Sequence, residues 1–198
     1  MRRIASGLAA LLMSVAGASA QDKDNPLSRA VPRAEGSSAC FSRSYDAAHL
    51  KAHPRQMTQS VMLSLRFDDE QGHVVRIMLR QKKPAPFHIV GVCGWSEKAN
   101  LGVDDKPLVK AFTKTSGLDC AAFAGLESDV EGGDFPIDFA EDGQSLTLYL
   151  VDQTSAWSGA NQAKKTAGLR LGKDDLIFRL DRTDAATCGG MEKALRSK

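Results

Sequence analysis

The sequence predicts a mainly β protein: an antiparallel barrel or sandwich of about six to eight strands, with one or two short helices. Apolar and polar residues alternate in several segments after Cys40, and this period of two is typical of half-buried strands. Short stretches rich in Asp and Gly separate those segments and indicate turns. A strand with one apolar face must cover that face, so the strands are expected to close on themselves or to pack as two sheets.

The first 20 residues have the three parts of a secretory signal peptide. Arg2 and Arg3 are followed by a short apolar run and by the small residues Ala18 and Ala20. We expect export to the periplasm or beyond, with no membrane anchor left after cleavage, because no later stretch has the length of a spanning helix.

The mature chain is predicted to form one domain. Residues 21–38 are polar, contain two prolines and are expected to be a flexible lead-in. The β-rich domain is expected over residues 39–190, and residues 191–198 are expected to be a tail.

Three hairpins are predicted in chain order. Residues 63–67 and 75–79 form the first, and a third strand follows over residues 87–93. The other two predicted hairpins pair residues 135–139 with 146–150, and residues 169–171 with 176–180.

Two long segments interrupt this pattern. Residues 96–119 hold a possible short helix that Asp105 would cap. Residues 152–168 surround Trp157, which is expected either to pack on the barrel under a mobile loop or to belong to a binding loop.

The four cysteines all lie in the mature chain and predict two disulfides in an oxidising compartment. Cys93 and Cys120 flank the segment 96–119, so a bond between them would hold its ends together. Cys40 precedes the first ordered helix and Cys188 follows the last strand, so a second bond would join the two ends of the domain. We therefore predict the pairs Cys93 with Cys120 and Cys40 with Cys188.

The stretch SYDAAHLKAHP places His49 and His53 four residues apart, the spacing of two metal ligands on one helix. Pro54 disfavours helical backbone at His53, so the helix is expected to end there and the ligand geometry to be lost. We predict a helix on the barrel with His49 hydrogen-bonded at its edge, and name Tyr45, His49 and Trp157 as candidate interaction residues. A third ligand from His73 or His88 would restore a metal site.

The charge balance and the motifs of the sequence argue against several classes of function. The chain has 26 Lys and Arg against 24 Asp and Glu, and loss of Arg2 and Arg3 with the signal makes the counts equal. Basic and acidic residues are interleaved, so nucleic-acid binding is not expected. The sequence has no nucleophile elbow and no phosphate-binding glycine loop, so no catalytic residue, cofactor or metal is assigned.

The run C-F-S-R-S-Y-D-A-A-H-L-K-A-H-P-R-Q of residues 40–56, with residues 131–135 and 178–182, resembles small secreted bacterial proteins of uncharacterised activity. The resemblance implies an exported protein and a fixed structural role for residues 45–56, and it assigns no catalytic residue.

The expected function is an exported, non-catalytic binding or interaction module. One alternative is a lipocalin-like carrier with an apolar ligand inside the barrel. Another is a hydrolase or metalloenzyme that uses His49, His73 or His88.

Overall fold

A computed structural model of the chain describes residues 25–82, 86–97, 116–123, 131–150, 154–158, 166–169 and 171–196. The described helices are α1 (Pro26–Ala30), α2 (Ala47–Ala52) and α4 (Ala185–Arg196). The strands are β1 (Ser38–Ser44), β2 (Thr58–Asp68), β3 (Gly72–Gln81), β4 (Phe87–Ser96), β5 (Gly117–Phe123), β6 (Glu131–Phe139), β7 (Ser145–Tyr149), β8 (Ser155–Ser158), β9 (Thr166–Gly168) and β10 (Ile177–Thr183).

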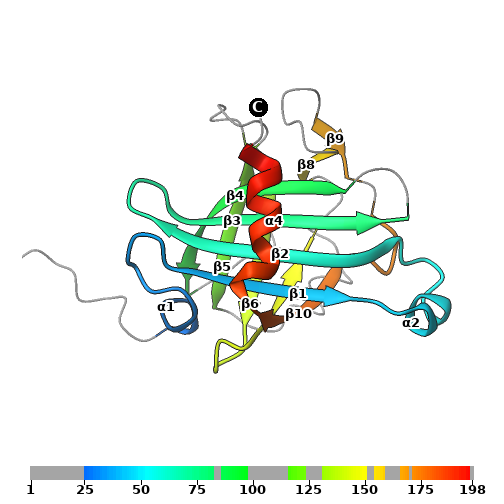
Figure 1. Cartoon of the computed structure of the whole chain (residues 1–198), viewed down its shortest axis with the longest axis horizontal. Coiled ribbons are helices and arrows are strands. Elements are labelled where there is room, and N and C mark those ends of the chain that lie inside the picture. Colours follow the sequence, from blue (N-terminus) through cyan, green and yellow to red (C-terminus); the bar gives the residue numbers. More distant parts are fainter. Residues whose placement is uncertain are drawn as a thin grey trace, which may run out of the picture.

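Eight of these strands close into an antiparallel barrel (Figure 1). Neighbours around the ring follow chain order from β1 to β7, then β10, which pairs back to β1. The pairing of β3 with β4 completes the closure. The predicted mainly β barrel is confirmed, although the described residues hold three helices where one or two were expected.

Alternating side chains fill the barrel from opposite strands. Phe41, Phe135 and Phe178 are at most 1% exposed, and they pack with buried leucines and isoleucines from β2 to β7 and β10. This alternation confirms the predicted hairpin of β2 with β3, the predicted strand β4, and the hairpin of β6 with β7.

The third predicted hairpin, residues 169–171 with 176–180, is wrong. β10 pairs with β7 and β1, because only that arrangement closes the ring. Residues 166–168, just before it, form β9, which pairs with β8 instead. The β8–β9 hairpin continues the sheet from the start of β4, where Phe87 and His88 pair with β8.

The expected flexible lead-in is wrong for residues 25–38. Asn25 caps α1 by accepting the Ser28 N–H at 2.8 Å, and Leu27 and Val31 are buried in the core at one end of the barrel. Arg182 donates to the Ala30 carbonyl at 3.3 Å. Apolar side chains at helical spacing therefore close this barrel end, while residues 21–24 lie outside the described part.

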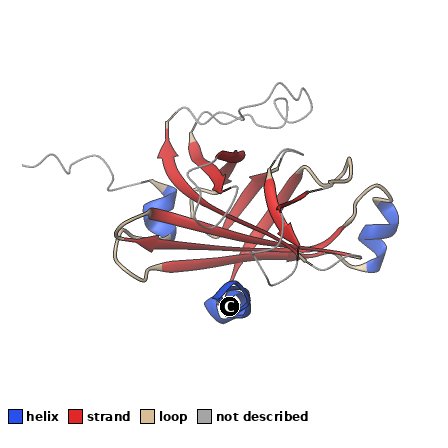
Figure 2. Cartoon of the chain, turned by 90° about the horizontal axis from the view of Figure 1, so that it is seen from above, coloured by secondary structure: helices blue, strands red, loops and turns tan. Residues whose placement is uncertain are grey.

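The C-terminal segment also differs from the expected tail. Helix α4 runs to Arg196 and lies across the outer face of the barrel, where it contacts β1 and β2 (Figures 1 and 2). Met191 is buried there beside Cys188 and Cys40, with Met78 of β3 packed against them. The helix continues past residue 190 because it has an apolar surface to cover.

Both predicted disulfides are confirmed. Cys40 of β1 bonds Cys188 of α4, and Cys93 of β4 bonds Cys120 of β5. The first bond holds α4 on the outside of the barrel, and the second joins two neighbouring strands.

Candidate functional site

Tyr45 and His49, two of the predicted interaction residues, lie together at the α2 end of the barrel. The ring centroids of Tyr45 and His49 are 4.7 Å apart, and those of His49 and His53 are 4.4 Å apart, all three rings stacked. Burial raises the pKa of Tyr45; Arg43 lowers it and Asp175 raises it to smaller extents.

The helix beneath this stack begins at its cap Asp46, which accepts the His49 N–H at 2.7 Å. It ends before His53, as the proline rule predicts. The His49 ring nitrogen Nε2 lies 3.0 Å from the Gln56 Oε1, which confirms the expected hydrogen bond at the helix edge.

A buried carboxylate fixes the loop after α2. Asp175 is fully buried and accepts the N–H groups of Met57, Thr58 and Gly172 at 2.7, 3.1 and 3.0 Å. Such charge-assisted bonds are the strong ones in proteins, so the carboxylate has a structural role.

Trp157, the third predicted interaction residue, is 2% exposed. It lies on β8 opposite His88 and packs with Val74 and Val90 on the outer face of the sheet. The expectation that it packs on the barrel is therefore confirmed, and no contact joins it to Tyr45 or His49 among the described residues.

The histidines do not form a metal centre within the described ranges, which hold no group of three His, Cys, Asp or Glu able to bind one ion. His73 is buried at the α1 end, with Nε2 3.1 Å from the Val31 carbonyl. His88 is buried on the outer face, and its Nδ1 has no hydrogen-bond partner among the described residues.

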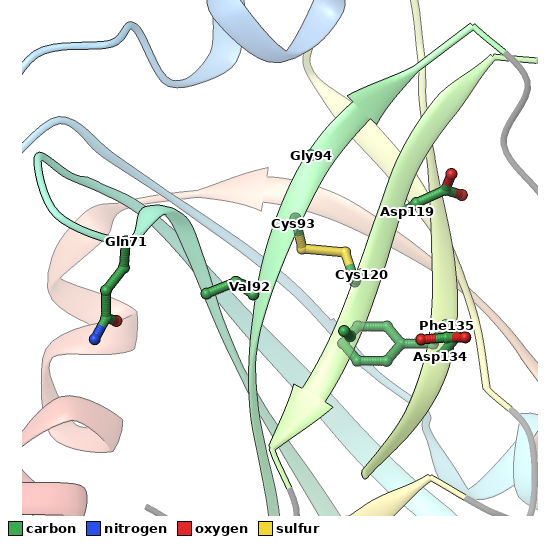
Figure 3. A pocket seen from close by; sticks show the side chains of 9 residues that line it. Gln71, Val92, Cys93, Gly94, Asp119, Cys120, Asp134 and Phe135 are labelled. Atoms are coloured by element: carbon green, nitrogen blue, oxygen red, sulfur yellow. A yellow bond between two sulfur atoms is a disulfide. The ribbon is translucent and has the colours of Figure 1, made fainter. Parts of the chain in front are cut away.

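A groove of about 500 Å³ lies on the outer face of β4, β5 and β6 (Figure 3). Its lining residues are Gln71, Val92, Cys93, Gly94, Asp119, Cys120, Ala121, Asp134 and Phe135.

Register explains why a hollow forms there. Gly94 pairs with Asp119 across β4 and β5, and a Cβ atom added to Gly94 would meet nothing within 4 Å. Ala121, two residues along β5 on the same face, is also small. Gly94 has no side chain and Ala121 has only a methyl group, so open space remains between larger neighbours.

The floor of the groove is covalently fixed. Cys93 and Cys120 are paired residues of β4 and β5, and both are buried directly beneath the groove. Figure 3 shows Gln71 on one side of the disulfide and the two aspartates on the other. The bond therefore holds β4 and β5 together beneath the groove.

The electrostatics of the groove are acidic. Asp134 is exposed and pairs with Ala121, while Asp119 pairs with Pro136, so the two aspartates are diagonal neighbours on one face. Such neighbours lie about 7 to 8 Å apart. No Lys, Arg or His stands among the described lining residues. Asp119 also takes part in a further interaction of the chain.

A second pocket, of about 340 Å³, lies at the α1 end of the barrel. Trp95 lines it, and its indole N–H donates to Glu97 at 2.9 Å. Arg29 and Asp138, which also line it, take part in further interactions of the chain. This pocket is smaller than the groove.

Sequence reasoning did not find the groove. The available signal was Gly94, a glycine at an outward position of a strand, directly after a half-cystine. Its pairing with Asp119 depends on the strand register, which the sequence does not specify.

No protein-family model matches the chain, and no curated protein and no solved structure matches it. Among the helices of the described residues, none has the length and apolar character needed to span a bilayer.

Proposed function

We propose that this protein is an exported, non-catalytic binding module that takes its ligand in the outer groove over β4, β5 and β6. The groove itself carries the proposal. Its volume of about 500 Å³ is within the range of ligand pockets, roughly 300 to 1,000 Å³. It combines apolar surface from Val92 and Ala121 with a few polar groups, which is the usual composition of a binding site.

The barrel interior is a weaker candidate for the ligand. An interior carrier needs a cavity, and an eight-stranded barrel is either filled by its own side chains or holds one small ligand. Here Phe41, Phe135 and Phe178 belong to one core cluster with aliphatic side chains that are likewise almost fully buried. The lipocalin-like alternative would require these side chains to move apart.

Export is supported by the cysteines. Two disulfides are typical of an oxidising, extracellular or periplasmic environment. The proposed signal peptide, residues 1–20, lies outside the described residues, so its cleavage is part of the proposal.

The test is a fragment screen followed by amide NMR of the isotope-labelled mature protein. Hits are expected to shift the amide signals of Gly94 and Ala121. The variant Gly94→Ile should abolish those shifts, because a β-branched side chain suits a strand and here fills the hollow. Thr147→Ile, on the outer face of β7, is the matched control.

If the fragments bind Gly94→Ile as tightly as they bind the original protein, the groove is not the binding site. An apolar fluorescent probe that binds both proteins and shifts interior signals such as Leu148 would favour the lipocalin-like carrier instead.

A further inference from the structure

We infer that the groove over β4, β5 and β6 selects an organic cation: an ammonium or guanidinium group on an aliphatic stem. This inference rests on the proposed function, and it adds the chemical class of the ligand.

The charge of the groove is its first support. Asp134 is exposed on β6, and Asp119 lies diagonally from it on β5. The described lining residues include no basic side chain, and Asp119 has a further interaction of its own in the chain. A cation between two carboxylates is favoured by both, whereas an anionic ligand would be repelled.

Asp134 is the more important of the two. Asp119 takes part in a further interaction of the chain. Asp134 lies at the outer edge of the groove, opposite Ala121, whose methyl group leaves room for a ligand.

The apolar part of the groove is the second support. Val92 and Gly94 of β4 and Ala121 of β5 provide a surface of small side chains without charge. An aliphatic stem can lie on this surface while its charged end reaches the aspartates, the arrangement that lysine and arginine side chains adopt on proteins. Gln71, at the far rim, offers an amide to a polar group at the other end of the stem.

The described residues favour an organic cation over a metal ion. The described residues hold no group of three suitable ligands, and two carboxylates on separate strands leave most of an ion's coordination unfilled. A hydrogen-bonding cation with an apolar stem uses both the charge and the hollow.

The experiment measures four named probes on the mature protein by amide NMR at low salt. Acetyl-lysine methylamide carries the ammonium group, acetyl-norleucine methylamide keeps the stem without charge, and acetyl-glutamate methylamide carries the opposite charge. The peptide acetyl-Ala-Lys-Ala-amide then tests whether the cation comes from a lysine within a peptide chain or from a small free amine.

The lysine probe should shift the signals of Gly94 and Ala121 and bind at least threefold more tightly than the norleucine probe. The glutamate probe should not bind. Raising the salt from about 10 mM to about 150 mM should weaken the lysine probe severalfold, because exposed charge pairs are screened.

Asp134→Asn should weaken the lysine probe about threefold and leave the norleucine probe unchanged, as expected for one exposed ion pair. The control is Asp181→Asn, which removes a carboxylate from β10, outside the groove lining. That change should leave both probes unaffected.

Equal binding of the lysine and norleucine probes, or preference for the glutamate probe, would overturn the cation inference. If Gly94→Ile still blocks such binding, the groove itself stands as the binding site. If Asp134→Asn binds the lysine probe as tightly as the original protein does, that result would equally overturn the inference.

Discussion

Two glycines of β4 differ in what an added side chain would meet. A Cβ atom on Gly91 would collide with the carbonyl group of Ala121 on β5, whereas one on Gly94 would enter open space. Gly91→Ala should therefore cost about 1 to 3 kcal/mol, the range for forced overpacking. Gly94→Ala should be neutral or stabilise by up to about 1 kcal/mol, through lower entropy of the unfolded chain. Urea unfolding of both variants measures this, and equal midpoints would contradict the close approach of β4 to β5 at Gly91.

His88 is a residue whose protonation opposes folding. Burial lowers its pKa below 6.5, because desolvation disfavours the imidazolium form. The unfolded chain takes up this proton at higher pH than the folded chain does. The free energy of unfolding should therefore fall as the pH drops from about 6.5 towards the folded pKa.

The matched variant is His88→Leu, which has a similar size and does not titrate. From about pH 7.5 to about pH 5.5 it should lose less stability than the original protein. At the upper pH it should unfold at a similar or higher urea concentration, because it also removes the unpaired Nδ1. Parallel pH profiles of the two proteins would show that His88 charges equally in both states.

At the scale of elements, α1 acts as the cover of one barrel end. Leu27 is 2% exposed and belongs to the same core as the barrel side chains. Leu27→Ala should cost about 2 to 5 kcal/mol, the range for a buried leucine. Deletion of residues 21–31 should cost at least as much. The exposed Pro32→Ala is the control, and urea unfolding is the measurement. A deletion variant as stable as the full mature chain would support the hypothesis of a flexible lead-in.

At the scale of the whole molecule, the two disulfides close loops of very different length. Cys40 and Cys188 are 148 residues apart, and Cys93 and Cys120 are 27 apart. In the chain-entropy model the longer loop contributes about 5 kcal/mol and the shorter one about 3.5 kcal/mol. Replacing both cysteines of a pair by alanine should therefore destabilise more for the first pair. The reverse order in urea unfolding would mean that strand pairing at β4 and β5 depends on its bond.

The fold was predictable wherever one face of a strand is buried. Alternation found β2, β3, β4, β6 and β7, because each turns apolar side chains at every second position into the barrel core. It missed β1 and β5, whose outward residues include the half-cystine Cys40 in one case and the small Ala121 in the other, so the contrast between faces is weak. Helix α1 was missed because its few apolar residues acquire a partner surface only when the barrel closes.

The candidate site was predictable only in part. The stack of Tyr45 and His49 follows from local spacing and from Pro54, which the sequence contains. The groove depends on register between three strands, and on Gly94 lying beside Asp119. A shift of β5 by one residue would turn Asp119 to the other face of the sheet. Composition alone could therefore not specify the groove.

The bond between Cys40 and Cys188 also determines how the molecule carries a mechanical load. A pull on the chain before Cys40 and after Cys188 passes directly from one sulfur to the other, through Cα atoms only 5.8 Å apart. Every barrel strand after Cys40, from the rest of β1 to β10, lies within the loop that this bond closes, so the covalent path of the pull bypasses those strands. An outward tug at both ends would therefore straighten only the short flanking segments and leave the groove intact.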